Sequence, residues 1–246
     1  MNPTPFGDER WTTRSGRFGA LSTQRDTVAA ALGRASTDPS AVTKLFDISG
    51  AHLERAVDAN TRLFQSPTLP ASQRYTGVVH DHMNLAKMPT ANRAIAVESV
   101  VIFSGLAGLV GIEDPMPDYR IKMGALLDPI GNLGRFWRDA IDAQLAALAP
   151  SLVIDLLPKE HAAAWSPGAI GVPVIRVQFL HVGPNGKRKI IGHDAKAAKG
   201  LLARHILMSS SVPAKAARTF RHDGWHLESS APSAGITQLT YIRQTG

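Results

Sequence analysis

A run of basic residues in the last quarter of the chain has the chemistry to bind phosphates. Six residues belong to it: Lys187, Arg188, Lys189, Lys196, Lys199 and Arg204. The last three follow spacings of three and eight residues, which place them within one broad face of a helix. Arginine offers a planar fork of donors and lysine a point charge, and both suit phosphate oxygens. A solvated helix face with no ligand explains the same pattern, so both interpretations stay open.

A second candidate is a pair of helices joined by a glycine turn. From Val42 to Ala59, an apolar helical pattern stops at Ile48-Ser49-Gly50 and restarts at once. This looks like a helix-hairpin-helix, whose turn exposes the backbone N–H groups at the start of the second helix to a DNA phosphate without reading sequence. The predicted contact residues are Ser49, Gly50, Ala51, His52 and Arg55. Because a full motif usually has a second glycine where this chain has His52, a plain helical hairpin packed on the core is the alternative.

The sequence lacks the familiar motifs of several enzyme and metal-binding classes. It contains neither Gly-x-Ser-x-Gly nor Gly-x-x-x-x-Gly-Lys-Ser/Thr, so it supports neither an α/β-hydrolase nor a P-loop enzyme. Without cysteine, disulfides, thiolate metal sites and cysteine nucleophiles are excluded. His and Asp are adjacent at His80-Asp81-His82, His193-Asp194 and His222-Asp223, but none of these has the spacing of a metal site. We expect neither a metal ion nor a cofactor.

The net charge favours a phosphate-rich partner. It is +7 at pH 7, and the isoelectric point is near 10.0. Each basic side chain that meets a phosphate displaces a condensed counterion. The polar N-terminus, Met1 to Arg17, lacks the apolar core of a signal peptide, and no apolar run reaches the roughly 20 residues that span a bilayer. We expect a cytoplasmic protein that makes no membrane contact and binds DNA or another polyanion.

Patterns along the chain predict an α+β fold built as one large domain. Hydrophobic residues at 44% and charged residues at 19% are ordinary values for a globular protein. Residues 1–22 lack apolar periodicity and predict an irregular arm. Residues 23–246 are expected to form a mixed sheet surrounded by helices, with the helix-hairpin-helix-like segment at about 42–64.

Individual elements follow from apolar spacing and from turn residues. Strands are predicted over 97–103, 151–156, 173–181 and 236–243, where Val and Ile recur. The turn Pro184-Asn185-Gly186 predicts a hairpin that returns over 189–192. Asp194 is expected to cap a helix that runs to Met208. Further helices are predicted over 24–32, 39–46, 51–64, 136–148 and 212–220.

Several segments occur in the order and spacing of a known family. They are Tyr75-Thr76-Gly77, Phe103-Ser104-Gly105-Leu106 with Gly108, Asp114-x-x-Pro117-x-Tyr119-Arg120-x-x-Met123-Gly124, Phe136-Trp137, Ile154-Asp155-Leu156 and Ala195-Lys196-x-x-Lys199-Gly200. On these residues, the chain resembles the peroxide-stress YaaA family over about 40–243. The resemblance implies an undivided α+β fold with a basic cleft, binding of double-stranded DNA, and protection of DNA from iron-driven oxidative damage. It also implies the residues that line the cleft: Tyr75, Ser104, Arg120, Lys196 and Lys199.

The N-terminus departs from the family pattern. Family members usually begin with a short apolar strand that leads into a loop contributing to the cleft. Met1 to Arg17 contains no such strand, and Pro3-Thr4-Pro5-Phe6-Gly7-Asp8 is a poor substitute. The chain is therefore expected to be a divergent member with an altered edge of the sheet.

A catalytic role for the same cleft is the second hypothesis. Tyr, Ser, Arg and two Lys residues can hold a small-molecule ligand, with one lysine of lowered pKa as base or nucleophile and Arg120 as an oxyanion or phosphate clamp. This would be a YaaA-like enzyme recruited to biosynthetic chemistry. The two hypotheses differ in what they predict, because DNA binding should weaken steeply with salt whereas an enzyme should bind a small ligand instead.

Overall fold

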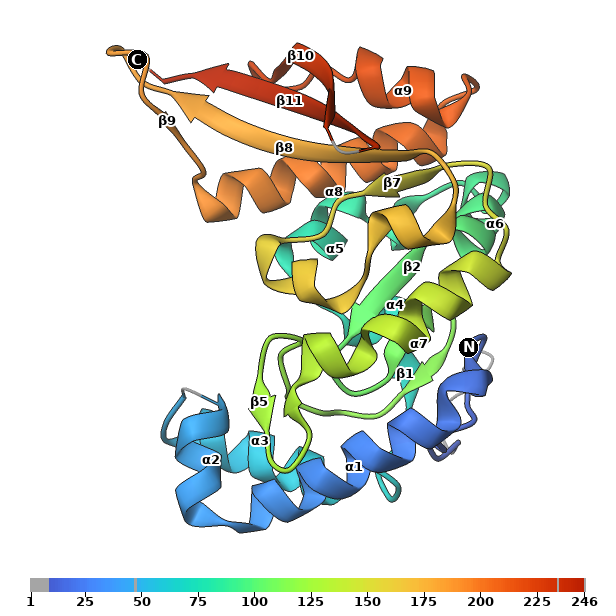
Figure 1. The fold of residues 1–246 in the computed structure, drawn as a ribbon, viewed down its shortest axis with the longest axis vertical. Helices are drawn as coiled ribbons and strands as arrows, with labels where there is room; N and C mark the ends of the chain where they lie inside the picture. The colour runs from blue at the N-terminus through green and yellow to red at the C-terminus, as the bar shows by residue number, and fades with distance from the viewer. Residues whose placement is uncertain (1–8, 47, 234, 246) are drawn as a thin grey trace. The chain divides into compact units, whose positions relative to one another are not determined.

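Helices interleaved with short strands make up the computed structural model, which describes residues 9–46, 48–233 and 235–245 (Figure 1). The α+β class and the mixed sheet predicted from the sequence are confirmed. The chain forms two compact units, and each is assembled from separate stretches of sequence. The first unit comprises the described part of Met1–Arg74 with Ser99–Ala147 and Pro158–Ser166, and the second comprises Tyr75–Glu98, Leu148–Leu157 and the described part of Pro167–Gly246.

The first unit is mainly helical, and its short strands associate in pairs. Its helices are η1 (Gly19–Leu21), α1 (Ser22–Thr37), α2 (Pro39–Phe46), α3 (Ala51–Thr61), α4 (Ala71–Arg74), α7 (Leu133–Ala147) and η3 (Lys159–Ala164). Its strands are β1 (Leu69–Pro70), β2 (Val101–Ser104), β3 (Gly108–Gly111), β4 (Pro115–Met116), β5 (Leu126–Leu127) and β6 (Gly131–Asn132). The strands pair antiparallel as β1 with β4, β2 with β3, and β5 with β6. Helices α1, α2 and α3 pack on one another.

A buried arginine joins the start of the described chain to the β2–β3 hairpin. Arg25 on α1 is 1% exposed, and its guanidinium donates hydrogen bonds of 2.8–3.1 Å to four backbone carbonyls. Those carbonyls belong to Thr13, Ser15, Ala107 and Leu109. A buried cation is tolerated only when its donors are satisfied, so these contacts fix the path of the chain before α1.

Residues 9–22, which belong to the expected irregular arm, have little regular structure but are well packed. Trp11, Phe18 and Leu21 are no more than 2% exposed, and the Trp11 ring stacks on that of Phe64 at 5.5 Å. Apolar periodicity cannot reveal this burial, because the buried side chains are irregularly spaced. The rest of the expected arm, including Pro3 to Asp8, lies outside the described residues.

The second unit is built on a five-stranded mixed sheet. Its strands are β7 (Val153–Asp155), β8 (Val174–Val182), β9 (Arg188–Lys189), β10 (His226–Ser233) and β11 (Ile236–Gln244). The order is β10-β11-β8-β7, with β9 also paired to β8. Strand β8 runs parallel to β7 and β11, whereas β10 and β9 are antiparallel to their neighbours. The hairpin predicted around Pro184-Asn185-Gly186 is confirmed, although the returning strand is only two residues long.

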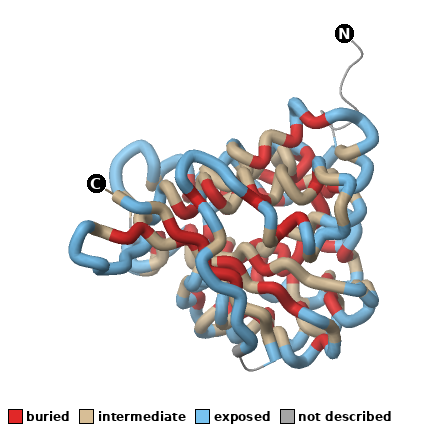
Figure 2. Tube along the Cα trace, turned by 90° about the horizontal axis from the view of Figure 1, so that it is seen from above, coloured by how far each residue is buried: buried red, intermediate tan, exposed pale blue. Residues whose placement is uncertain are grey.

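Helices of the second unit cover the sheet and enclose an aromatic core. They are α5 (Val78–Met83), η2 (Leu85–Lys87), α6 (Thr90–Ser99), η4 (Pro167–Ile170), α8 (Gly192–Met208) and α9 (Pro213–Thr219). Helix α8 packs along β8 and against α9 (Figure 1). The Phe179 ring lies against Phe220, Trp225 and Tyr241, at centroid distances of 5.1–6.2 Å. Burial along the chain is coloured in Figure 2; within the sheet, β8 and the second half of β11 hold most of the buried positions, whereas β9 is exposed.

Gly200 allows α8 to touch the backbone of α5. A Cβ atom at Gly200 would lie 2.3 Å from the Val79 carbonyl oxygen and 2.7 Å from the His82 Cβ. Real side chains do not approach backbone atoms this closely. Gly200 therefore marks a close approach of another backbone.

Two local predictions from the sequence were wrong, and one strand was missed. The strand expected from residue 97 begins at Val101, because the Ala-rich helix α6 continues to Ser99. Asp194 does not cap α8, because the helix starts at Gly192 and places Asp194 in its first turn. Strand β10 was missed because its Glu, Ser and Pro residues show no apolar alternation, which is tolerated at the edge of a sheet.

We expect Gly200→Ala to destabilise the second unit by about 2 kcal/mol or more, because the added Cβ overlaps backbone atoms. Gly33→Ala is the matched control, since Gly33 also lies inside a helix but nothing is within 4 Å of the position that its Cβ would occupy. That control should gain about 0.5–1 kcal/mol from helix propensity. Chemical denaturation measures both changes. Equal stabilities for the two variants would contradict the close contact between α5 and α8.

Candidate functional site

The five residues expected to line the cleft divide between the two units. Ser104 and Arg120 belong to the first unit, and Tyr75, Lys196 and Lys199 belong to the second. Within the first unit, Ser104 meets the residue before Arg120. Within the second unit, Lys196 and Lys199 lie on α8. A cleft shared by all five residues stays a prediction.

Ser104 is held by local hydrogen bonds at the end of β2. It is 1% exposed, its hydroxyl lies 2.8 Å from the Tyr119 hydroxyl, and it accepts a hydrogen bond of 3.0 Å from the Ala107 N–H. No general base activates this hydroxyl among its described partners, in contrast to a catalytic serine. The arrangement gives Ser104 a role in shaping the turn after β2 and in fixing Tyr119.

The turn between α2 and α3 has an exposed surface and a backbone that requires glycine. Gly50 has φ 59° and ψ −146°, a conformation that residues with a Cβ rarely adopt, and nothing lies within 4 Å of a Cβ built there. Ser49, Ala51 and His52 are exposed or partly exposed. Asp47 lies outside the described residues. The structure shows two helices joined by a turn, while a helix-hairpin-helix is not confirmed and DNA contact here stays a prediction.

The basic residues of the second unit have different environments. Lys187, Lys189 and Lys196 are exposed. Arg188 forms a two-pronged ion pair with Glu228 at 2.7 and 2.9 Å. Arg204 donates three hydrogen bonds of 2.8–3.1 Å to backbone carbonyls at Met83, Asn84 and Lys87. Arg204 thus braces α8 against α5 and η2, and Lys196, Lys199 and Arg204 do not present their charges in the same way.

Lys199 lies in a partly buried polar cluster at the end of β7. Its amine donates a 2.8 Å hydrogen bond to the Leu157 carbonyl. Nearby, Arg176 donates to the carboxylate of Asp155 at 2.6 Å, and Asp155 is 5% exposed. Burial lowers the pKa of Lys199 below its ordinary value, the charge of Asp155 opposes this effect, and the Arg176 guanidinium lowers the pKa further. A lysine with these properties is more easily deprotonated than an exposed one.

Tyr75 stacks on a histidine of α5. The Tyr75 and His80 ring centroids are 5.7 Å apart, with 26° between the planes. Burial lowers the pKa of His80, and the neighbouring Asp81 opposes that shift. The pair adds a neutral aromatic surface to the polar residues of this unit.

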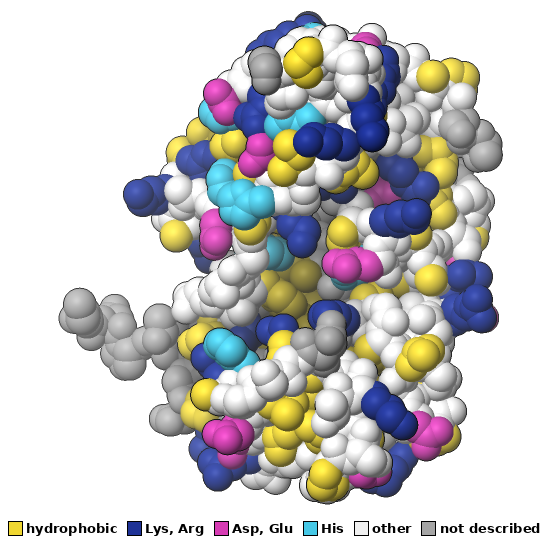
Figure 3. Space-filling view, turned by 90° about the vertical axis from the view of Figure 1, so that its left-hand side faces the viewer, with side chains coloured by type: hydrophobic (Ala, Val, Ile, Leu, Met, Phe, Trp, Pro, Cys, Tyr) yellow, Lys and Arg dark blue, Asp and Glu magenta, His cyan; other side chains and the backbone are white. Residues whose placement is uncertain are grey.

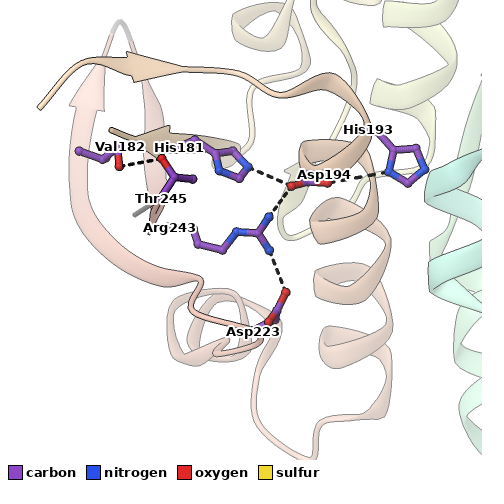
Figure 4. A network of polar contacts seen from close by, with 7 residues as sticks. All are labelled: His181, Val182, His193, Asp194, Asp223, Arg243 and Thr245. Carbon is purple, nitrogen blue, oxygen red and sulfur yellow. Dashed lines mark hydrogen bonds and ion pairs between the residues drawn. The ribbon is translucent and has the colours of Figure 1, made fainter. Parts of the chain in front are cut away.

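The His-Asp pairs noted in the sequence do not gather into a metal site. In the parts of the chain that the structure describes, no group of three or more His, Asp or Glu side chains could hold a metal ion. Two of the aspartates instead meet at one arginine. Arg243 on β11 contacts Asp194 and donates to Asp223 at 2.8 Å (Figure 4).

His181, which sequence patterns did not single out, completes this network. It is 1% exposed, and its Nε2 lies 3.2 Å from the Asp194 carboxylate (Figure 4). The Arg243 guanidinium also lies 4.9 Å from the Trp225 ring centroid. The network ties the first turn of α8 to the ends of β8 and β11. The adjacent pairs His193-Asp194 and His222-Asp223 were visible in the sequence, but the link that Arg243 and His181 make to their aspartates was not.

Within the described ranges, no helix has both the length and the apolar character needed to cross a bilayer.

We expect the stability of the second unit to fall as the pH drops below about 6.5. Burial lowers the pKa of His181, Arg243 and Lys189 lower it further, and Asp194 opposes the shift. Because the unfolded chain then binds the proton more readily than the folded chain, stability is retained above the ordinary pKa of 6.5 and lost below it. His80 contributes in the same direction.

Denaturant titrations between about pH 7.5 and about pH 5 measure this dependence. His181→Phe should flatten it in part, because a buried ring remains but no longer titrates. An unaltered pH dependence in His181→Phe would show that His181 is not responsible.

Comparisons with known proteins place this architecture in a defined group. A family model described as peroxide stress protein YaaA matches residues 9–231. A UPF0246 protein of Streptomyces coelicolor is 36% identical over 188 residues, covering 74% of this chain and 71% of the relative. A UPF0246 protein of Idiomarina loihiensis is 31% identical, covering 71% and 69% of the two chains. One of Corynebacterium glutamicum is 30% identical, covering 89% and 83%.

Proposed function

This chain belongs to the peroxide stress protein YaaA family, and from that premise we propose that it binds double-stranded DNA, or another polyanion, through non-specific contacts to phosphates. The observation that carries the proposal is a set of exposed lysines in the second unit. Lys187, Lys189 and Lys196 are exposed and have no ion pair among the described residues, so their charges are available to phosphates.

Charge and turn geometry add to this proposal. The net charge is +7, and Figure 3 shows both basic and acidic side chains on the face in view. The excess of basic residues favours a polyanionic partner. At the start of α3, the open turn at Gly50 offers backbone N–H groups, which supports a phosphate contact in the first unit.

The family's name links this proposal to peroxide stress. A protein bound along phosphates covers the sugars beneath it and limits the access of iron and peroxide. We extend the proposal to protection of DNA during oxidative stress in the cytoplasm.

Binding to a short labelled duplex should weaken steeply as salt rises, because each phosphate contact releases about 0.9 counterion. Lys196→Ala should weaken binding several-fold and reduce the salt slope by about 1. Gly50→Val should weaken binding as well, since valine does not tolerate a φ of 59° and displaces the turn. Fluorescence anisotropy over a salt series measures affinity and slope together.

Two controls match these changes. Lys215→Ala removes an equal charge from an exposed position on α9 and should have a smaller effect. Gly171→Val introduces a comparable strain, since Gly171 has φ 67° and open surroundings, but it lies outside the proposed contacts. If Lys215→Ala lowers duplex affinity as much as Lys196→Ala, and Gly171→Val as much as Gly50→Val, the effects come from overall charge and backbone strain and not from specific contacts. Absence of binding at low salt would refute DNA binding.

A second candidate function rests on Lys199. Its buried amine, beside Asp155 and Arg176, has the lowered pKa expected of a base or nucleophile in small-molecule chemistry. The proposed enzyme would bind a small ligand with Lys199 and Lys196, and with Tyr75 as a hydroxyl donor. Its substrate is defined only as a molecule that an amine can deprotonate or attack.

Amine labelling should detect the unusual lysine directly. Competitive acetylation of the folded protein across a pH series, read by mass spectrometry, gives the midpoint at which each lysine becomes reactive. We expect the midpoint of Lys199 to lie below the ordinary lysine value of 10.5, because burial destabilises the charged amine. Arg176→Gln should raise the Lys199 midpoint, since one neighbouring positive charge is removed. A Lys199 midpoint at the ordinary lysine value would remove the support for a catalytic amine.

A further inference from the structure

The segment that ends at Arg120 is held by the rest of the first unit at consecutive residues. Asp118 forms an ion pair with Arg55 of α3 at 3.1 Å and lies 4.0 Å from the Arg74 guanidinium. The Tyr119 hydroxyl lies 2.8 Å from the Ser104 hydroxyl. Both side chains before Arg120 are therefore turned toward protein partners. The segment is fixed although it forms no helix or strand.

Asn60 fixes the backbone of Arg120 itself. The Arg120 N–H donates a 2.8 Å hydrogen bond to Asn60 Oδ1, and Asn60 Nδ2 donates a 3.0 Å hydrogen bond to the Arg120 carbonyl. Asn60 lies in the last turn of α3 and is 1% exposed. A side-chain amide can satisfy one backbone N–H and one carbonyl at the same residue, which aspartate and leucine cannot do.

The backbone of Arg120 is hydrogen-bonded to Asn60, whereas its side chain is exposed. Arg120 is exposed, and its guanidinium has no hydrogen bond or ion pair among the described residues. Several other arginines have partners, although Arg120 is not alone in lacking one: Arg25 and Arg204 bind carbonyls, and Arg55, Arg176, Arg188 and Arg243 bind carboxylates. A fixed backbone with an unengaged guanidinium lowers the entropy that must be lost when an anion binds.

We propose that Asn60 is a positioning residue that presents the Arg120 guanidinium to an oxyanion, and that this oxyanion is a phosphate of the nucleic-acid backbone. The identity of the phosphate rests on the proposed function, whereas the presentation of Arg120 rests on the hydrogen bonds to Asn60. Because the clamp uses only backbone atoms of Arg120, the side chain can be replaced without breaking it. The arrangement also links α3, which begins next to Gly50, to the Arg120 segment of the same unit.

Arg120→Ala should weaken binding to a short labelled duplex about tenfold and reduce the salt slope by about 1. Arg62→Ala is the charge-matched control, because Arg62 is exposed at the end of α3 but pairs with Asp58 at 3.0 Å. That control should stay within about twofold of the original protein. If Arg120→Ala and Arg62→Ala bind alike while the original protein binds the duplex, the proposal is overturned and DNA binding stands.

A double-mutant cycle separates positioning from folding. Asn60→Leu should lower duplex affinity when Arg120 is present and have no further effect on affinity in the Arg120→Ala background. Its cost in stability should be the same in both backgrounds, because the clamp does not use the arginine side chain. Equal losses of affinity in both backgrounds would mean that Asn60 acts only on stability.

Chemical modification gives a readout that depends neither on the Asn60 variants nor on DNA binding. Phenylglyoxal should modify Arg120 of the folded protein, and inorganic phosphate should protect it while leaving Arg62 reactive. The modification experiment still tests whether Arg120 binds an oxyanion if the original protein does not bind the duplex or if Asn60→Leu does not fold. Protection of Arg120 by phosphate would support the site, and modification unaffected by phosphate would overturn it.

Discussion

The absence of a side chain at Gly200 is the constraint on which the second unit depends most. It lets α8 rest on the carbonyl of Val79, so the distance between α8 and α5 is set by backbone atoms rather than by adaptable side chains. Arg204 then fixes the later turns of α8, and Asp194 fixes its first turn to Arg243. The contacts of Gly200, Arg204 and Asp194 fix the orientation of α8 about its own axis. That orientation decides which lysines of the helix face water.

Much of the positive charge that the sequence displays is used inside the protein. Arg25 satisfies four carbonyls near the start of the chain, and Arg204 satisfies three beside α5. Arg176 and Arg188 are paired with carboxylates. The net charge therefore does not tell how many cations the protein offers to a partner. The cations that remain available, such as Lys196 and Arg120, carry more weight in a binding argument than the total does.

Prediction from the sequence succeeded where one local signal dominated. The alternating strands at β8 and β11, the Pro-Asn-Gly turn and the helix expected over 39–46 are examples in which local pattern and structure agree. It failed where distant residues decide the outcome. Strand β10 exists because β11 pairs with it, and Asp194 turns to Arg243, far away in the sequence, instead of capping its own helix.

The candidate site shows the same division. The helix that carries Lys196 and Lys199 was predicted correctly, but the spacing of the two lysines could not show that their environments differ. Lys196 is exposed, whereas Lys199 donates to the Leu157 carbonyl and has a lowered pKa. An exposed lysine suits contacts to phosphates, whereas a lysine whose pKa is lowered is more easily deprotonated and so better suited to act as a base. Polyanion binding therefore draws mainly on Lys196, and the catalytic alternative rests on Lys199 with Lys196 as a second ligand.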